Sequence, residues 1–137
     1  SLSERLMRLQ GKLLLVEDKP DNRIIIVAML RKLGLQADIA EDGQQAIDAT
    51  AAKAYEVVLM DCQMPGVDGY AATRTIRARE AEGQHTHIIA LTANALKGDR
   101  EKCLAAGMDD YIAKPATVRQ LQEAFERWMT TQRARPA

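Results

Sequence analysis

The chain lacks the features that would place it in several large classes of protein. Its 137 residues carry 19 basic and 19 acidic side chains, and the lack of basic excess argues against a nucleic-acid partner. No apolar run is long enough to span a membrane, and no signal peptide precedes the first apolar segment. We therefore expect no direct membrane contact and a cytoplasmic location. The length suits one domain with its own core.

Cysteine and histidine are also scarce. The two cysteines, Cys62 and Cys103, have neither metal-type nor redox-type spacing, which is typical of free thiols in a reducing compartment. Cys62 follows an aspartate and could be a reactive thiol, although buried cysteines are usually inert. His85 and His87 could suggest a metal pair, but we expect a solvated loop there.

The most informative segment that the chain does contain is 57–69. Four apolar residues run directly into Asp61, and a Pro-Gly turn and an Asp-Gly pair follow. Such a run, bounded by turn signals, is typical of a strand buried on both faces. Asp61 would then lie at the carboxyl end of the strand, where a parallel α/β sheet opens its crevice. Alternatively, Asp61 only begins the loop and caps the next turn.

The rest of the chain alternates short apolar segments with helical patterns. Expected strands occupy residues 12–16, 35–40, 57–61, 88–91 and 110–113, and expected helices occupy residues 20–33, 43–54, 69–81 and 97–106. Thr117 would cap a last helix, with Gln120 at the capping-box position and a buried stripe of Leu121, Phe125 and Trp128. This pattern predicts an α/β fold with a five-stranded parallel sheet and helices on both faces. Right-handed crossovers favour the doubly wound, flavodoxin-like order 2-1-3-4-5.

The two ends of the chain are expected to lie outside this fold. Residues 1–11 carry Leu2, Leu6 and Leu9 at helical spacing and are interpreted as a linker or the end of an upstream helix. The domain would occupy residues 12–131, and residues 132–137 would form a tail.

Polar side chains stand where the expected strands end. Glu17 and Asp18 follow the first strand, Asp61 ends the third, Thr92 follows the fourth and Lys114 follows the fifth. In the order 2-1-3-4-5 the first and third strands are neighbours, so three carboxylates would meet in one crevice. Like charges this close need a cation, and a few hard oxygen ligands suit Mg²⁺. A metal-assisted carboxylate beside a lysine is suited to phosphoryl transfer onto an aspartate.

These residues stand in motifs that resemble those of receiver domains, the response-regulator domains of two-component and phosphorelay signalling. The resemblance covers about residues 12–130. It rests on Leu15-Val16-Glu17-Asp18, on Met60-Asp61-Cys62-Gln63-Met64-Pro65-Gly66-Val67-Asp68-Gly69, on Leu91-Thr92-Ala93 and on Tyr111-Ile112-Ala113-Lys114-Pro115. Each segment alone is a weak signal, whereas the four in this order are highly specific.

The resemblance implies a role for each residue at the strand ends. Asp61 would be the phosphoacceptor. Asp18 would ligate Mg²⁺ (or Mn²⁺) directly, Glu17 would do so mainly through water, and the Gln63 backbone carbonyl would be a further ligand. Thr92 and Lys114 would bind the phosphoryl oxygens, and Tyr111 would act with Thr92 as the switch. The Lys114–Pro115 bond would be cis. Many receivers have two aspartates in place of the Glu17-Asp18 pair, and the longer glutamate can alter the metal affinity.

Residues 90–95 with Gly98-Asp99, and residues 107–111, are similar to receivers of hybrid sensor histidine kinases. The resemblance implies the receiver module of such a bacterial kinase, with a stand-alone response regulator as the alternative. The domain would catalyse its own phosphorylation and dephosphorylation, and its parent, a histidine kinase, could be membrane-anchored. Expected partners are a histidine kinase domain and a histidine-containing phosphotransfer protein, and the domain would be a monomer or a weak dimer.

Simpler or different interpretations exist for these residues. Lys114 could be a surface lysine, Thr92 could merely end a strand, and Tyr111 could be a core residue. A phosphatase with an aspartate nucleophile would need a second acid where the chain has Gln63. A flavin-binding module would need a hydroxyl- and amide-rich loop after the first strand to hold a phosphate. This chain has acidic residues in that loop, beginning with Glu17, and they would repel phosphate. A degenerate receiver that only docks partners would not need the complete set of charges.

The first expected helix carries more apolar residues than one buried stripe requires. The residues expected to face the sheet are Ile26, Met29, Leu30 and Leu33. Ile24 and Val27 would project to the opposite side, where core packing does not account for them. Single exposed apolar residues are common, but the resemblance implies a helical phosphotransfer partner. Ile24 and Val27 are therefore candidate docking residues.

Overall fold

The computed structural model describes residues 2–93 and 97–134 and contains the expected alternation of strands and helices. The strands are β1 (Leu13–Val16), β2 (Asp38–Ala40), β3 (Val57–Asp61), β4 (His87–Thr92) and β5 (Asp110–Ala113). The helices are α1 (Leu2–Leu6), the 3-10 helix η1 (Met7–Leu9), α2 (Pro20–Lys32), α3 (Gly43–Ala52), α4 (Gly69–Arg79), α5 (Lys97–Ala106) and α6 (Val118–Ala134). Among these described helices none is long and apolar enough to cross a membrane.

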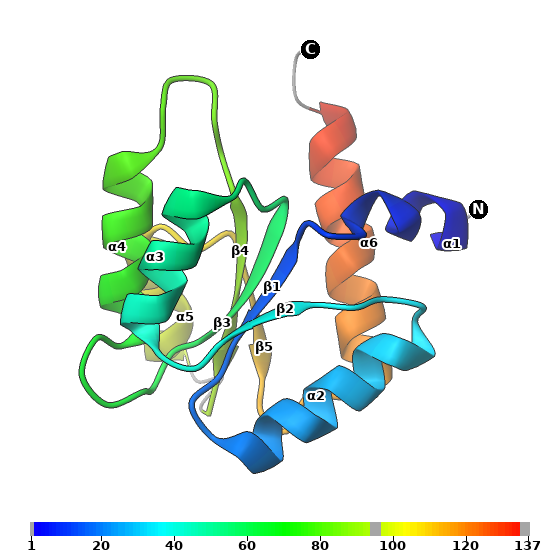
Figure 1. The fold of residues 1–137 in the computed structure, drawn as a ribbon, viewed down its shortest axis with the longest axis horizontal. Helices are drawn as coiled ribbons and strands as arrows, with labels where there is room; N and C mark the ends of the chain where they lie inside the picture. Colours follow the sequence, from blue (N-terminus) through cyan, green and yellow to red (C-terminus); the bar gives the residue numbers. More distant parts are fainter. Residues whose placement is uncertain (1, 94–96, 135–137) are drawn as a thin grey trace.

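The five strands form one parallel sheet in the order β2-β1-β3-β4-β5 (Figure 1), which confirms the predicted topology. Leu15 of β1 is paired with Leu59 of β3, so the two strands that lead to the acidic residues lie side by side. On the other side of β3, Asp61 is paired with Leu91 of β4. Every residue of β1, β3 and β4 is buried. These strands are apolar on both faces because helices cover both faces of the sheet.

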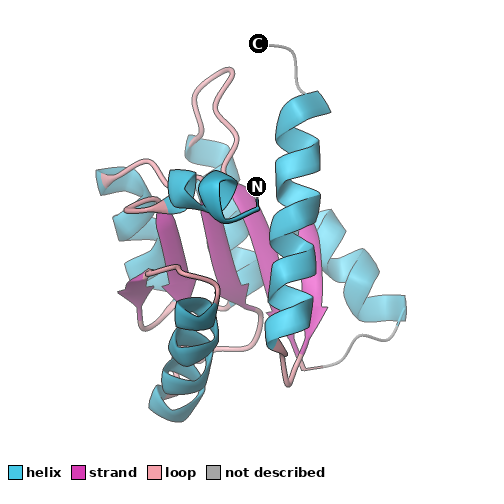
Figure 2. Ribbon diagram, turned by 90° about the vertical axis from the view of Figure 1, so that its right-hand side faces the viewer, coloured by secondary structure: helices cyan, strands magenta, loops and turns pink. Residues whose placement is uncertain are grey.

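Alternate residues of the strands belong to two separate cores. Leu15, Leu59 and Leu91 pack against α2 and α6 on one face, whereas Val16 and Met60 pack against α3, α4 and α5 on the other. Figure 2 shows α1, α2 and α6 in front of the sheet and the other helices behind it. The two-residue period of a strand therefore divides each apolar run between two helical layers.

Three elements are shorter by two or more residues than the sequence predicts. The second strand starts at Asp38, because the Leu35 amide donates to the Leu30 carbonyl at 2.9 Å and closes the end of α2. Gly34, with φ of +80°, makes this helix ending possible. Helix α3 ends at Ala52 and α4 at Arg79, each two residues before the expected end.

The segment before β1 packs on the domain. Leu6 and Leu9 are buried in the same core as Trp128 and Met129 of α6, while the side chain of Leu2 is outside the described part of the chain. Helix α6 continues to Ala134, so residues 132–134, expected in the tail, are helical; residues 135–137 lie outside the described residues. The core between the sheet, α2 and α6 therefore includes apolar residues that precede the first strand.

Candidate functional site

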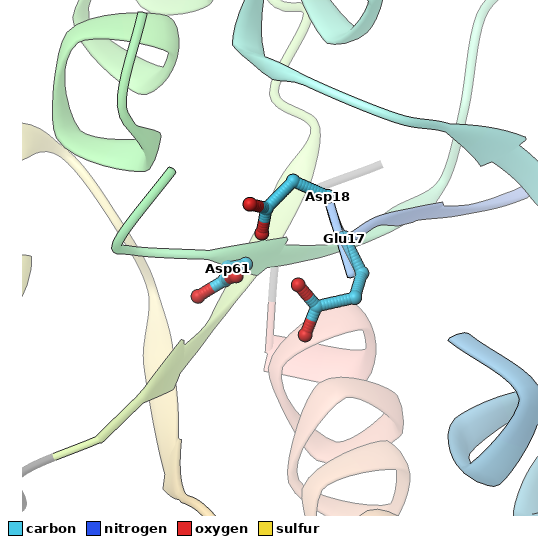
Figure 3. Close-up of side chains that lie close together, drawn as sticks. All are labelled: Glu17, Asp18 and Asp61. Carbon is cyan, nitrogen blue, oxygen red and sulfur yellow. The ribbon is translucent and has the colours of Figure 1, made fainter. Parts of the chain in front are cut away.

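Three carboxylates meet at the carboxyl edge of the sheet. Glu17 and Asp18 directly follow β1, and Asp61 is the last residue of β3. One carboxylate oxygen from each lies within 4.8 Å of the others, and Figure 3 shows the three side chains converging from the two neighbouring strands. Glu17 and Asp61 are buried. The parallel pairing of β1 with β3 therefore builds the acidic cluster that the sequence predicts.

Lys114 supplies the positive charge of the cluster. Its Nζ lies 2.9 Å from Oδ1 of Asp61 and 3.1 Å from Oε1 of Glu17. The lysine follows β5, and its amide donates to the Thr92 carbonyl at 2.7 Å, so β4 and β5 together fix its position. The bond to Pro115 is cis, as the resemblance implies. Lys114 is therefore an ion-paired residue of the crevice.

Arg23 is a residue of this site that the sequence reasoning did not identify. From the first turns of α2 its guanidinium donates to the carbonyls of Glu17 (2.8 Å) and Asp18 (3.1 Å). These bonds hold the backbone of the acidic pair against the start of the helix, because a charged donor makes strong bonds to carbonyl oxygens. A basic residue one turn after an acidic pair was the signal that could have identified it.

The loop after Asp61 is held closely against the end of β3. A Cβ on Gly69 would lie 2.2 Å from the Asp61 carbonyl oxygen, so only glycine fits there. The Gly69 amide donates to the Cys62 carbonyl at 3.1 Å, and Asp68 caps α4 by accepting from the Ala71 amide at 2.8 Å. This close approach keeps the residues after Asp61 at the crevice.

Burial shapes the electrostatics of the cluster. Burial and the hydrogen bond with Glu17 raise the pKa of Asp61 to about 7, and Lys114 offsets this only in part. Burial also opposes ionisation of Glu17, but hydrogen bonds with Asp61, Lys114 and Asp18 outweigh it and hold the pKa of Glu17 at about 2. In the protein without a bound cation, ionisation of Asp61 is therefore less favourable than for an ordinary aspartate.

The donor set fits a hard divalent cation. Three carboxylates face one lysine, and Oδ1 of Asp18 is buried with no hydrogen-bond partner among the described residues. Buried acceptors in native proteins are nearly always satisfied, so one that is not needs an explanation. The Gln63 amide donates to Oδ1 of Asp61 at 3.2 Å, which places the Gln63 backbone beside the cluster. Oxygen ligands in this number suit Mg²⁺, which keeps several waters.

Thr92 and Tyr111 lie farther along the same edge. The buried Thr92 hydroxyl donates to Oδ2 of Asp99, in the first turn of α5, at 3.0 Å. The Tyr111 ring is half-buried against the core beneath α5 and lies 5.9 Å from the Arg100 guanidinium. The sequence reasoning did not identify Asp99 as the partner of Thr92. The Asn94-Ala95 part of the hybrid-kinase resemblance lies outside the described residues.

The exposed apolar face of α2 differs from the predicted one. Ile24 is 68% exposed, as expected. Val27 is half-buried and packs against the core, so its expected projection to the solvent side is wrong. Helix α2 contacts α6 as well as the sheet, which widens its buried arc beyond a single stripe. Ile25, 51% exposed, takes the place of Val27 and lines a cleft of about 290 Å³ with Lys114 and Pro115.

The two histidines do not form the solvated loop that the sequence predicts. His87 is buried as the first residue of β4. Nε2 of His85 lies 2.6 Å from Oδ1 of Asp109, and Arg77 donates to Oδ2 of the same carboxylate at 2.7 Å. The expectation was wrong because Arg77, near the end of α4, donates to the Thr86 carbonyl at 2.7 Å and ties this loop to the helix. The resulting ionic cluster is at the opposite end of the strands from Asp61.

The two cysteines meet behind Asp61. Both are buried, and their Sγ atoms are 3.9 Å apart. Burial raises the pKa of the Cys62 thiol to about 12, and it raises the pKa of the Cys103 thiol as well. Both thiols are thus protonated at neutral pH.

The family model described as "Response regulator receiver domain" matches residues 13–126. Among curated proteins, the chain is 40% identical to the sensor protein GacS of Pseudomonas syringae pv. syringae, over 85% of the chain and 13% of GacS. It is 45% identical to hybrid signal transduction histidine kinase I of Dictyostelium discoideum, over 83% of the chain and 7% of that kinase. The chain thus spans a small part of the length of these relatives.

Solved structures that resemble this chain are also receiver domains. The receiver domain of a sensor histidine kinase from Pseudomonas aeruginosa, which holds a magnesium ion in its active site cleft, is similar at 52% identity and a TM-score of 0.78, covering 86% of this chain and 96% of that one. The receiver domain of Saccharomyces cerevisiae Ssk1, crystallised with the histidine phosphotransfer protein Ypd1, is similar at 29% identity and a TM-score of 0.78, covering 88% of this chain and 89% of that one.

Proposed function

The chain belongs to the response regulator receiver domain family, and we propose that it accepts a phosphoryl group on Asp61 from a phosphohistidine and changes conformation in response. The observation that carries this proposal is the meeting of Glu17, Asp18 and Asp61 within 4.8 Å, with Lys114 at 2.9 Å from Asp61. This arrangement positions a carboxylate nucleophile among groups that neutralise phosphoryl charge, which is most of what phosphoryl transfer requires.

Each residue of the cluster has a defined part in the transfer. A carboxylate oxygen of Asp61 forms the new bond to phosphorus as the bond from phosphorus to the donor nitrogen breaks. Lys114 moves its charge-assisted hydrogen bonds from the carboxylates to the phosphoryl oxygens. Asp18, Asp61 and the Gln63 carbonyl would hold Mg²⁺, and Glu17 would support it through water; Mn²⁺ would suit the same oxygen ligands. The cation supplies charge neutralisation for the carboxylates and the transferring group.

The response of the domain starts at Thr92. A phosphoryl group on Asp61 adds negative charge and acceptor oxygens at the edge of the sheet. The Thr92 hydroxyl, which donates to Asp99 in the present structure, turns to that group and releases the first turn of α5. The Tyr111 ring then enters the volume that Thr92 leaves. This is a two-state element that a local charge biases.

The parent protein proposed here is a cytoplasmic-facing hybrid sensor histidine kinase. Support comes from the relatives, of which the match covers 13% of GacS and 7% of the Dictyostelium kinase, and kinase activity itself is not proposed for this chain. A stand-alone regulator is less well supported, because both relatives are kinases several times longer than the match. The phosphodonor would be a histidine kinase domain or a histidine-containing phosphotransfer protein, as in the Ssk1–Ypd1 complex.

Helix α2 is the surface that we assign to the phosphodonor protein. Ile24 and Ile25 are exposed beside the crevice, and Arg23 ties the same helix to the acidic pair. A helical partner that covers Ile24 and Ile25 would hold its histidine over Asp61. Apolar residues on an exposed helix face suit this mode of binding.

Incubation with acetyl phosphate and Mg²⁺, read by intact mass, tests the acceptor assignment. The chain should gain one phosphoryl group, and Asp61→Asn should gain none. Asp109→Asn is a matched control that removes a carboxylate at the opposite end of the sheet, and its folded form should still be labelled. Labelling of Asp61→Asn at the parent rate would show that another residue accepts the group.

Ile24→Glu tests the docking surface. The substitution should slow transfer from the cognate phosphotransfer protein by roughly tenfold, which corresponds to one lost apolar contact of about 1.4 kcal/mol. Labelling by acetyl phosphate should not change, because a small donor needs no docking. Leu104→Glu, a substitution at a residue 50% exposed on α5, should leave both reactions intact. An equal loss in the two variants would contradict a specific site on α2.

A further inference from the structure

Two buried thiols lie directly behind the phosphoacceptor. Cys62 follows Asp61 at the end of β3, and Cys103 lies on α5. Although 41 positions separate them in the sequence, their Sγ atoms are 3.9 Å apart. Each side chain is 1% exposed, and both belong to the core between the sheet and helices α4 and α5. The fold therefore brings a dithiol to the strand end that carries the reacting carboxylate.

We propose that Cys62 and Cys103 form an oxidisable pair, whose disulfide ties the end of β3 to α5 and slows phosphorylation of Asp61. The slowing of phosphorylation rests on the proposed function, whereas formation of the disulfide does not. Disulfides in proteins of reducing compartments are usually transient and often redox-sensing.

The oxidant is hydrogen peroxide, which is small and uncharged. Because both thiols are buried and protonated at neutral pH, the attack proceeds from the thiolate that forms when this part of the core opens locally. One thiol sulfur attacks peroxide, the O–O bond breaks, and a sulfenic acid and one water form. The second sulfur then attacks the sulfenic sulfur, the S–S bond forms, and the S–O bond breaks with release of a second water. The two thiols together lose two protons and two electrons, and the peroxide is reduced to two waters.

Formation of the bond requires movement next to the reacting carboxylate. A disulfide brings its sulfurs to about 2.05 Å, so Cys62, Cys103 or both must shift from their separation of 3.9 Å. The backbone of Cys62 is bonded on both sides, to Leu91 at 3.0 Å and to Gly69 at 3.1 Å, so a shift of Cys62 also displaces the adjoining Asp61. Misplacement of a reacting group by about 1 Å can cost as much as a hundredfold in rate.

The tether also acts on α5. The first turn of this helix holds Asp99, which accepts the Thr92 hydroxyl, and Cys103 lies one turn farther along the same helix. A disulfide from Cys103 to β3 would fix α5 in the position in which Asp99 retains Thr92. The oxidised chain would therefore favour the unphosphorylated conformation.

Treatment of the full chain with hydrogen peroxide tests the formation of the bond. The intact mass should fall by about 2 Da, the change expected when two thiols form a disulfide. A non-reducing peptide map should join the peptides of Cys62 and Cys103, and dithiothreitol should restore the mass. Cys103→Ala, or Cys103→Ser where the alanine variant does not fold, should show no such loss. An unchanged parent mass, or oxidation only to sulfinic acid, would overturn the proposal.

The rate of labelling by acetyl phosphate and Mg²⁺ tests the consequence. The oxidised chain should be labelled roughly tenfold more slowly than the reduced chain, and dithiothreitol should restore the rate. The Cys103 variant should be labelled equally fast before and after peroxide. Equal rates for the oxidised and reduced parent would overturn the link to phosphorylation. Failure of the reduced parent to be labelled would instead refute the proposed function of Asp61, while the mass change would still decide the thiol pair.

Discussion

Two clusters of charged side chains lie at opposite ends of the sheet, and they differ in how completely their charges are matched. At the carboxyl ends of β1 and β3, the carboxylates of Glu17, Asp18 and Asp61 lie together, and the Lys114 ammonium group pairs with Glu17 and Asp61. One oxygen of Asp18 has no hydrogen bond with any described residue. This cluster has an excess of negative charge and a raised pKa at Asp61.

The second cluster, at the amino ends of β4 and β5, is held by several hydrogen bonds. Asp109 accepts from the Arg77 guanidinium at 2.7 Å and from the Ile88 amide at 2.8 Å, and His85 lies 2.6 Å from its other oxygen. Arg77 also donates to the Gly107 carbonyl at 2.8 Å and to both carboxylate oxygens of Glu80 at 3.0 Å. These bonds join α4 to the loops that precede β4 and β5.

The comparison separates a structural use of charge from a functional one. Where an arginine fork meets several matched acceptors, as around Arg77, the bonds hold α4 against the loops that precede β4 and β5. Where donors and acceptors do not match, as around Asp61, the protein retains an unfavourable cluster that a cation can relieve. Substitutions at the two ends should therefore have opposite consequences for stability and for ligand binding.

The largest expected effect is on cation affinity at the carboxyl end. Asp18→Asn should weaken Mg²⁺ binding by at least about tenfold, since even outer-shell partners of a bound metal contribute that much. Isothermal titration at neutral pH measures this. Asp109→Asn, the same chemical change at the other end, should leave the affinity of the folded protein unchanged. Equal weakening in both variants would mean that general charge, and not this site, holds the cation.

The next largest effect is on stability at the amino end. Arg77→Ala should lower the free energy of unfolding by about 3 kcal/mol, because it leaves Asp109 and Glu80 as partly buried carboxylates without their partner. Urea unfolding followed by circular dichroism measures the change. Arg77→Lys should lose less, since it keeps the charge but not the fork of donors. A loss below about 1 kcal/mol would place this cluster with ordinary surface ion pairs.

Asp61→Asn should make the protein without a bound cation more stable. The pKa of Asp61 in the folded chain, about 7, lies above the usual value of 3.8. Ionisation of Asp61 therefore costs stability progressively as the pH rises from about 4 to about 7. Asparagine removes that cost but also loses the ion pair with Lys114, so we expect a net gain of about 1–2 kcal/mol at pH 8 and little gain at pH 4. Thermal unfolding in EDTA at both pH values tests this, and a net loss at pH 8 would contradict it.

The smallest effect is expected at His85. Its side chain is 32% exposed, and partly solvated ion pairs contribute little. His85→Ala should lower the free energy of unfolding by less than about 1 kcal/mol and should leave Mg²⁺ affinity unchanged. Because Arg77 and the Ile88 amide still satisfy Asp109 in this variant, a loss as large as that of Arg77→Ala would show that the cluster acts as one unit.

The carboxyl-end cluster was predictable from the sequence, and the amino-end cluster was not. Each residue of the first lies at the end of a strand, so the strand order brings Glu17 and Asp61 to neighbouring strand ends and places Lys114 at the same edge of the sheet. Arg77 and Asp109 belong to a helix end and a loop, and their meeting depends on how α4 packs across the sheet. The misplacement of Val27 has a similar origin, because the helical period does not reveal that α2 also contacts α6.

The sequence by itself determined the order of elements, the sheet topology and the acidic crevice. Apolar runs of residues 13–16, 57–60 and 88–91 can be buried only between two layers of helices, and the polar residues that end these runs must then share one edge of the sheet. The tertiary structure alone decided the contact between Cys62 and Cys103, the partner of Thr92, and the burial of Leu6 and Leu9 on α6. These contacts join segments that no local pattern relates, so their distances depend on the packing of helices against the finished sheet.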